Sequence, residues 1–355
     1  MSRKPLRTES FSQCPLPISQ HDTVQLGHGS GGVMMHDLIG RLFRWAFDNP
    51  TLNRMDDQAV LALDSNRIAV STDSFVIDPL FFPGGDIGEL AVYGTVNDVA
   101  MCGAKPLYLT AGFIIEEGFS LSDLQTIVVS MRDAAHACGV TIVTGDTKVV
   151  NKGKGDKLFI NTTGIGIIGH DFVISGSNLQ PDDVIILSGS IAEHGIAVLS
   201  KREGLTFETS IVSDAAPLHE LVQVMIAAGG NGIHAMRDPT RGGVAATLNE
   251  LASSSHVGIR VIEKAVPVQS AVASACGLLG LDPLHVANEG KLIAAVSPAS
   301  ADRVLAAMRA HPRGANAAII GSVTAADPGR VQLQTILGSW RILDMPVGEQ
   351  LPRIC

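Results

Sequence analysis

Short apolar runs that end in an aspartate alternate with helix-like segments along this chain. Residues 67–73 (RIAVSTD) and 141–146 (TIVTGD) have the apolar character of buried strands. Apolar residues recur at helical spacing over residues 33–47 and 121–139, and Gly139 is a helix stop signal. We expect further strands at 106–116 and 158–169, and one helix or two short ones at 84–104. The pattern predicts a mixed α/β fold of the α+β type.

The second half of the chain repeats this mixture after a polar, turn-forming stretch near residues 170–182. A length of 355 residues favours two domains. We therefore expect an extension at 1–24, an N-terminal domain at 25–175, a C-terminal domain at 176–344 and a mobile tail at 345–355. No repeat period of about 20–50 residues is visible, which argues against a solenoid or propeller.

Charge and hydropathy narrow the class of protein. The chain has 26 basic and 35 acidic residues and no basic block, which argues against nucleic-acid or membrane-surface binding. Hydrophobic residues make up 46%, enough to bury a core. There is no apolar run of about 18 residues to span a membrane, and the N-terminus lacks the apolar region of a secretory signal. We expect a soluble cytoplasmic protein.

Several aspartates have apolar residues or glycines as sequence neighbours, and an unpaired charge is costly to bury in such surroundings. They are Asp56, Asp57, Asp73, Asp98, Asp146 and Asp238. Carboxylates at strand and loop ends are suitable ligands for Mg²⁺, which takes oxygen ligands and bridges phosphates. The alternative for each residue alone is a helix cap or a turn. As a set, they favour a metal site.

Other segments carry groups that suit phosphate chemistry. GHGSGG at 27–32 exposes backbone N–H groups before a helix, as phosphate-binding loops do, although a flexible linker is an equal alternative. It matches neither the Walker pattern nor the dinucleotide-binding pattern. Lys148 follows a strand end in GDTKVV, and Arg241 lies in DPTRGG. Glu289 lies in a loop-like stretch and is unremarkable alone.

The five cysteines are widely spaced and odd in number, which argues against a disulfide framework or a zinc site. Four of them are expected to be ordinary packing residues. Cys355 is the last residue, where a small apolar side chain serves no packing purpose. A tail of ten residues can reach at most about 33–36 Å, enough to bring this thiol into an active site.

Taken together, these motifs resemble the HypE family of hydrogenase maturation proteins, in the ATP-binding superfamily of aminoimidazole ribonucleotide synthase and selenophosphate synthetase. The resemblance runs from about residue 25 to residue 355. It rests on GHGSGG, the Asp pair at 56–57, the stretch at 71–104, GDTKVV, DPTRGG, NEGK at 288–291 and the terminal PRIC.

The resemblance implies a fold and an activity. The N-terminal domain would bind ATP under the GHGSGG loop, and its strands would pair across a homodimer into a central barrel. The thiol of Cys355 would receive a carbamoyl group from a HypF-like carbamoyltransferase. ATP-dependent dehydration would convert this group to a thiocyanate. The cyanide would then pass to iron on a HypC–HypD-like scaffold for the [NiFe]-hydrogenase centre.

The resemblance also assigns residues to roles. It implies Mg²⁺ ligands at Asp56, Asp57, Asp73, Asp98 and Asp238. It implies ATP contacts at Gly29, Ser30, Gly31, Gly32, Asp73, Asn97, Gly145, Asp146, Thr147 and Arg241. Besides Cys355, the catalytic residues would be Glu289, as the proton acceptor, and Lys148, which would stabilise the developing oxyanion or phosphate.

Three alternatives remain from the sequence. A selenophosphate synthetase-like enzyme would need a reactive cysteine beside the glycine loop, but GHGSGG has none and Cys14 lies well upstream. An aminoimidazole ribonucleotide synthase-like enzyme, like the first alternative, leaves the terminal cysteine unexplained. From another class, the chain would be a thiol-carrying scaffold with a silent ATP site.

Overall fold

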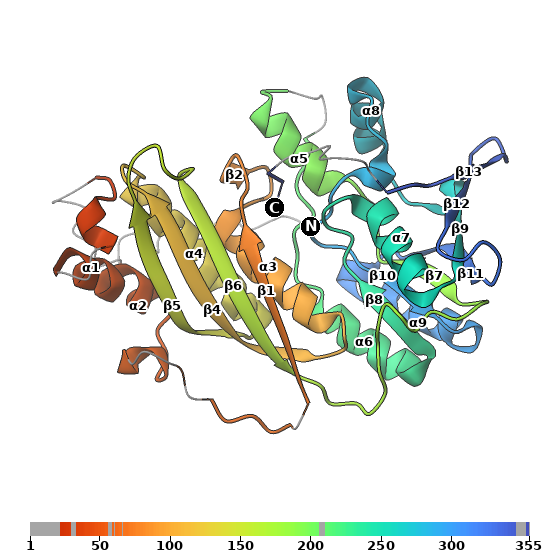
Figure 1. The fold of residues 1–355 in the computed structure, drawn as a ribbon, viewed down its shortest axis with the longest axis horizontal. Coiled ribbons are helices and arrows are strands. Elements are labelled where there is room, and N and C mark those ends of the chain that lie inside the picture. The colour runs from red at the N-terminus through yellow and green to blue at the C-terminus, as the bar shows by residue number, and fades with distance from the viewer. Residues whose placement is uncertain are drawn as a thin grey trace.

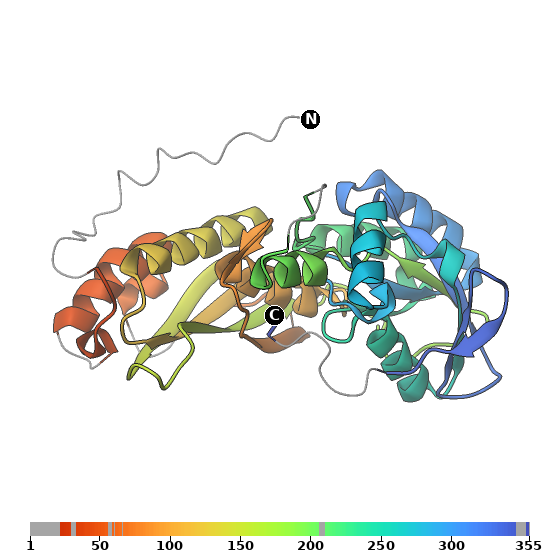
Figure 2. The ribbon, with the colours of Figure 1, turned by 90° about the horizontal axis from the view of Figure 1, so that it is seen from above.

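The computed structural model describes residues 22–29, 33–55, 59, 61–65, 67–205, 210–345 and 353–354. It has two halves that lie side by side, each built on its own main sheet (Figures 1 and 2). The first sheet has four strands and the second has seven. This is the mixed α/β, two-domain architecture that the sequence predicts. None of the helices in the described part of the chain is long and apolar enough to cross a membrane.

The first half contains most of the predicted elements. Its strands are β1 (Ile68–Phe75), β2 (Phe81–Phe82), β3 (Gly85–Asp86), β4 (Lys105–Glu116), β5 (Thr141–Val150) and β6 (Leu158–Ile167). Its helices are α1 (Val33–Leu38), α2 (Arg44–Ala46), α3 (Ile87–Ala100) and α4 (Leu121–Cys138). The main sheet has the order β1-β6-β4-β5, and only β4 and β5 run parallel. β2 and β3 form a separate two-stranded ribbon.

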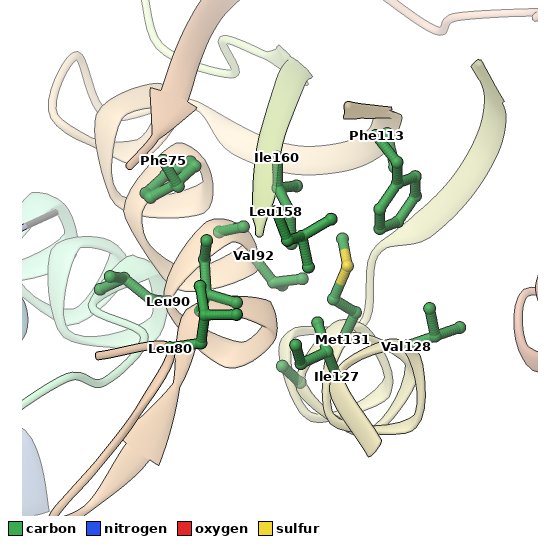
Figure 3. Packing of buried hydrophobic residues seen from close by; sticks show 14 of the residues in the cluster. Phe75, Leu80, Leu90, Val92, Phe113, Ile127, Val128, Met131, Leu158 and Ile160 are labelled. Carbon is green, nitrogen blue, oxygen red and sulfur yellow. The ribbon is translucent and has the colours of Figure 1, made fainter. Parts of the chain in front are cut away.

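The helices α3 and α4 cover one face of this sheet (Figures 1 and 2). Side chains of the strands alternate between that face and the opposite one. Leu158 and Ile160 of β6 therefore point toward Ile127 and Met131 of α4 (Figure 3). The opposite face exposes apolar side chains to solvent: Ile68 is 50% exposed, Val70 is 60% exposed and Ile114 is 46% exposed. The described residues of the chain leave that face uncovered.

The ends of these helices follow their sequence signals. The side chain of Asp86 accepts hydrogen bonds from the N–H groups of Gly88 (2.7 Å) and Glu89 (3.2 Å) and so caps α3. Gly139 ends α4 in the left-handed conformation at φ 65°, as predicted. The predicted helix at 33–47 differs, because a π-helical segment, Ile39–Phe43, separates α1 from α2. Gly40 lies in that segment.

The second half continues the chain with a larger sheet. Its strands are β7 (Val184–Leu187), β8 (Ile233–Arg237), β9 (Gly258–Ile262), β10 (Ile293–Val296), β11 (Ala318–Thr324), β12 (Val331–Gln334) and β13 (Trp340–Ile342). Its helices are α5 (Glu193–Arg202), α6 (His219–Gly229), α7 (Gly243–Ser255), α8 (Ser270–Leu279) and α9 (Pro298–Ala310). The strand order is β13-β12-β9-β11-β7-β10-β8.

Both faces of the second sheet are covered. Ile185 and Leu187 of β7 pack with α7, while Ile186 between them packs with α6 and α9. Such alternation requires apolar residues on both sides of a strand, which explains the continuous run VIIL. Cys138 and Cys276 are buried, as predicted for packing residues. The helix α5 lies over the seam between the two halves (Figures 1 and 2).

Candidate functional site

Three of the predicted metal ligands gather where the two halves meet. Asp73 lies on β1, Asp98 on α3, and Asp238 directly after β8. They line one open hollow of about 590 Å³ together with Ser71 and Arg241. The sequence places these residues far apart, so the docking of the two halves creates this cluster. We call Asp73, Asp98, Asp238 and the nearby Glu289 the acidic cluster.

Local structure explains how two of these carboxylates are held. Alternation along β1 puts Ser71 and Asp73 on the side of the sheet that faces α3. The hydroxyl of Ser71 donates a hydrogen bond to Asp98 Oδ2 at 2.9 Å. The N–H of Ser74 donates to Asp73 Oδ1 at 2.7 Å. The sequence analysis missed Ser71, although its spacing of two from Asp73 on a predicted strand was a usable signal.

Burial raises the pKa of each carboxyl in the cluster, and neighbouring carboxylates add to this for Asp98, Asp238 and Glu289. Burial and the neighbouring Asp98 raise the pKa of Asp238 to about 7. The pKa of Asp98 is raised by burial and by Asp73, although Ser71 and the positive charges of Arg237 and Arg241 act in the opposite direction. This hollow therefore has a surplus of negative charge that a bound cation would neutralise.

Glu289 lies deeper than the other members of the cluster. Its side chain is 3% exposed, and its Oε1 atom has no hydrogen-bond partner among the described residues. Burial, followed by the charges of Asp238 and Asp214, raises its pKa well above the ordinary value. Its own N–H donates to Asp214 Oδ1 at 3.2 Å, and Lys291 pairs with Asp214 at 3.0 Å. A buried carboxyl with a raised pKa and a free acceptor atom is suited to proton transfer.

The other predicted ATP contacts form a second group, on β5. Gly145 and Thr147 line a cavity of about 180 Å³ between this strand and the N-terminal helices. Gly29 packs so closely on β5 that an added Cβ would lie 2.6 Å from the backbone nitrogen of Val149. Only glycine fits such an approach. The start of the glycine loop and the GDTKVV motif thus meet at one edge of the first sheet.

Lys148 belongs to this β5 group and lies away from Glu289. β5 and β1 are the two edges of the sheet, separated by β6 and β4. Three strand spacings correspond to about 14 Å. Lys148 is exposed and pairs with Asp146 at 3.2 Å, on the sheet face opposite the helices. The expectation that Lys148 and Glu289 meet at one thiocarbamate is therefore not met within a single chain.

Asn97 has a role other than the predicted ATP contact. It is fully buried, and its Nδ2 donates to the carbonyls of Ala216 (3.0 Å) and Glu289 (3.2 Å). Its Oδ1 accepts from the N–H of Leu218 at 2.8 Å. These bonds join α3 to the second half of the chain. In this structure Asn97 therefore connects the two halves of the chain.

Comparison with known proteins decides the family. The sequence model described as AIR synthase related protein, N-terminal domain, matches residues 55–168, and the corresponding C-terminal domain model matches residues 180–334. The carbamoyl dehydratase HypE of Bradyrhizobium diazoefficiens is 56% identical over 332 residues, covering 94% of this chain and 96% of that protein. This chain belongs to the HypE family.

Solved HypE structures agree with this fold. HypE crystallised in complex with ATP superposes with a TM-score of 0.90 at 51% identity, covering 94% of this chain and all of that one (100%). A HypE chain from a HypE–HypF complex superposes with a TM-score of 0.77 at 50% identity, covering 87% of this chain and 99% of that one. The two halves described above are thus similar to those of solved HypE structures.

Six of the predicted site residues lie outside the described part of the chain. They are Ser30, Gly31, Gly32, Asp56, Asp57 and Cys355. Among the described residues, no group of three or more His, Cys, Asp or Glu side chains converges as a preformed metal cage. Asp73, Asp98 and Asp238 still fit Mg²⁺, which is commonly held by one or two carboxylates together with phosphate oxygens. The pKa values of all three are raised, chiefly because the carboxyls are buried.

The described end of the tail lies against the seam between the halves. Ile354, the neighbour of Cys355, is 4% exposed, and its carbonyl accepts a hydrogen bond from His194 at 2.7 Å. The carbonyl of Arg353 accepts one from Arg202 at 2.7 Å. No sequence motif marked His194 or Arg202, because their partners lie about 150 residues away in the chain. The sequence analysis also gave no signal for Asp214.

Proposed function

We propose that this protein uses ATP to dehydrate an S-carbamoyl group on its own Cys355 to a thiocyanate, and so supplies cyanide for the iron of [NiFe]-hydrogenases. The family is that of carbamoyl dehydratase HypE, and a member has been crystallised with ATP. The observation that carries the proposal is the buried carboxyl of Glu289, whose Oε1 lacks a partner among the described residues, at the seam where the tail ends.

The chemistry needs a leaving group and a base. The carbamoyl oxygen attacks the γ-phosphorus of ATP, and the bond from that phosphorus to ADP breaks. The C–O bond then breaks, phosphate leaves, and the nitrogen loses both protons as the C≡N bond forms. Glu289 is the proton acceptor, because its Oε1 atom has no hydrogen-bond partner among the described residues and is available to take a proton once the carboxyl is ionised. Arg241 stabilises the charge that develops on phosphate.

Metal binding fits the acidic cluster. Asp73, Asp98 and Asp238 would hold Mg²⁺, joined by Asp56 and Asp57 of the Asp pair. Bound Mg²⁺ neutralises phosphate charge and lowers the pKa of nearby carboxyls. Glu289 is close enough to Asp73, Asp98 and Asp238 for their charges to raise its pKa. A cation held by these aspartates would offset the negative charges that raise the pKa of Glu289.

We infer that two copies of the chain form the working unit. The uncovered face of the first sheet exposes Ile68, Val70 and Ile114, and such a face favours pairing with a second sheet into a barrel. Lys148 and the β5 group are on one edge of the sheet, and the acidic cluster is on the other. In a two-fold dimer, Lys148 would reach the acidic cluster of the second subunit. ATP would bind between them, under residues 29–32 and 145–147.

The tail connects this site to partners. We propose that residues 345–355 move between the docked position at the seam and a HypF-like carbamoyltransferase, which donates the carbamoyl group. A HypE–HypF complex is known, and its HypE chain is 50% identical to this one. A HypC–HypD-like iron scaffold would accept the cyanide. We propose a cytoplasmic location for the protein and domain limits at 25–175 and 176–344.

The test is the intact mass of the protein after incubation with a carbamoylating partner and ATP. We expect a gain of one carbamoyl group on the Cys355 peptide, followed by the loss of one water only when ATP is present. A Cys355→Ala variant is the control and should show neither change. ATP turnover that is independent of the donor and survives in this variant would overturn the proposal and favour a different substrate.

A further inference from the structure

The last two described residues lie in a cradle made by both halves of the chain. The side chain of Ile354 packs within the core cluster that contains Val198 of α5 and Ala287. The side chain of Arg353 forms an ion pair with Asp156, in the connection between β5 and β6. Ile354 thus occupies a closed apolar position, although residues this near a chain end are usually the most exposed in a domain.

His194, at the start of α5, holds one backbone group of the tail. Its Nε2 lies 2.7 Å from the carbonyl oxygen of Ile354, and its Nδ1 lies 2.8 Å from the hydroxyl of Ser213. A carbonyl oxygen can only accept, so Nε2 carries the hydrogen and Nδ1 accepts from Ser213 in the neutral ring. Burial lowers the pKa of His194, which favours this neutral form. The ring of Phe82 meets the imidazole edge-on at 5.4 Å.

Arg202, at the end of the same helix, holds the next backbone group. Its Nη2 donates to the carbonyl of Arg353 at 2.7 Å, and its Nε donates to the carbonyl of Asp78 at 2.7 Å. The N–H of Asp78 also donates to the carbonyl of Arg353, at 3.2 Å. One guanidinium therefore joins the tail of the chain to the segment between β1 and β2. His194 and Arg202 approach consecutive carbonyls from the two ends of α5.

This cradle is connected to the proton acceptor of the proposed reaction. Ser213, the partner of His194, precedes Asp214 in the chain. Asp214 in turn accepts a hydrogen bond from the N–H of Glu289. The same short segment thus contacts the imidazole that holds Ile354 and the residue proposed as the base. The position of Ile354 is therefore linked, through His194 and the segment 213–214, to the segment that contacts Glu289.

We propose that His194 and Arg202 are positioning residues that bind the carbonyls of Ile354 and Arg353 and so select the tail position from which Cys355 is dehydrated. This rests on the proposed function of the site. A few hydrogen bonds and one apolar side chain give a reversible dock, since each hydrogen bond contributes modestly. The tail can then leave to collect its carbamoyl group and return for the ATP-dependent step. Neither residue contacts the reacting atoms in this account.

Trypsin reports tail docking directly, because its cleavage site is the bond between Arg353 and Ile354. In the docked tail, Arg353 is paired and Ile354 is buried, so cleavage requires undocking. We expect His194→Phe and Arg202→Met each to speed the loss of the terminal dipeptide about tenfold, as measured by mass spectrometry of the C-terminal peptide. His194→Gln retains an N–H donor and should restore most of the protection.

A matched control is Arg309→Met. Arg309 also donates its Nε to a backbone carbonyl, that of Ala317 at 2.9 Å, but it lies on α9 and has no hydrogen bond to the described tail residues. This variant should lose the terminal dipeptide at the parent rate. Equal dipeptide loss in the parent, His194→Phe and Arg202→Met would overturn the proposed dock, whatever the activity of the enzyme.

The second readout separates positioning from a general loss of folding. In single-turnover experiments on carbamoylated protein, His194→Phe and Arg202→Met should dehydrate Cys355 about tenfold more slowly than the parent. They should accept the carbamoyl group from the donor at least as fast as the parent, since an undocked tail is more available. Slowing of both steps would indicate a structural role and overturn the proposal. If the parent itself forms no thiocyanate, the proposed function fails instead, and the trypsin result still tests the dock.

Discussion

Replacing Asp238 by Asn should change how the stability of the ligand-free protein depends on pH. Burial, followed by the charge of the neighbouring Asp98, raises the pKa of Asp238 from 3.8 to about 7. Between pH 3.8 and about pH 7 the Asp238 carboxyl is ionised in the unfolded chain but protonated in the folded protein. The free energy of unfolding therefore falls as the pH rises through this range, and it levels off above pH 7. From pH 5 to pH 7 the free energy of unfolding falls by about 3 kcal/mol, at 1.36 kcal/mol per pKa unit.

The assay is urea unfolding of the parent and of Asp238→Asn at pH 5 and pH 8, without nucleotide or metal. Going from pH 5 to pH 8, the variant should gain about 3 kcal/mol relative to the parent. Asp302→Asn, on the exposed side of α9, removes an equal formal charge away from the cluster and serves as the control. Saturating Mg²⁺ and ATP should stabilise the parent more at pH 8 than at pH 5, because cations bind ionised carboxylates. Identical pH dependence in parent and variant would refute the idea that these carboxylates suppress one another's ionisation.

Four further predictions concern other parts of the molecule. Glu289→Gln should slow dehydration about 10²–10⁴-fold, while fluorescent-nucleotide titration still shows ATP binding. Mixing the inactive Lys148→Gln and Glu289→Gln proteins should restore about one quarter of the parent thiocyanate rate if each site uses both subunits, and none if it uses one. The double change Val70→Lys and Ile114→Lys should give monomers in sedimentation velocity, whereas an unchanged dimer would rule out this face as the interface. Asn97→Ala should lower the free energy of unfolding by about 3 kcal/mol, because three buried hydrogen bonds are lost; a change below about 1 kcal/mol would contradict its role between the halves.

The sequence predicted much of the fold because its local signals agree with the tertiary structure. The alternation around Asp73 gives β1, and Gly139 ends α4 at the predicted residue. The strand predicted to end at Asp146 continues to Val150, because β5 stays paired with β4 through Glu116. That extension depends on the length of the neighbouring strand, which no local pattern encodes.

The arrangement of the site was harder to predict than its members. Asp73 and Lys148 both lie in motifs associated with phosphate chemistry, but the strand order places them at opposite edges of one sheet. β6 comes last among these strands in the chain and yet lies between β1 and β4. Long-range pairing of this kind is decided by the packing of whole strands. The sequence motifs therefore do not show that the predicted site residues lie in two groups.

Residues that are adjacent in the sequence also point to different surroundings in the structure. Asn97 and Asp98 are adjacent on α3, and successive residues of a helix point about 100° apart. Asn97 thus reaches the backbone of the second half, while Asp98 lines the open hollow. A resemblance that assigns a whole motif to one ligand misses this division, and only the packing of the two halves reveals it.

The most direct test of the proposed chemistry follows the oxygen atom of the carbamoyl group. Protein carrying an ¹⁸O-labelled carbamoyl group on Cys355 is mixed with ATP, and the inorganic phosphate released in one turnover is analysed by mass spectrometry. If the amide oxygen is phosphorylated and then expelled, the phosphate carries the label in proportion to the thiocyanate formed. Unlabelled phosphate alongside full conversion to thiocyanate would contradict the account, because the oxygen would then have left by another route.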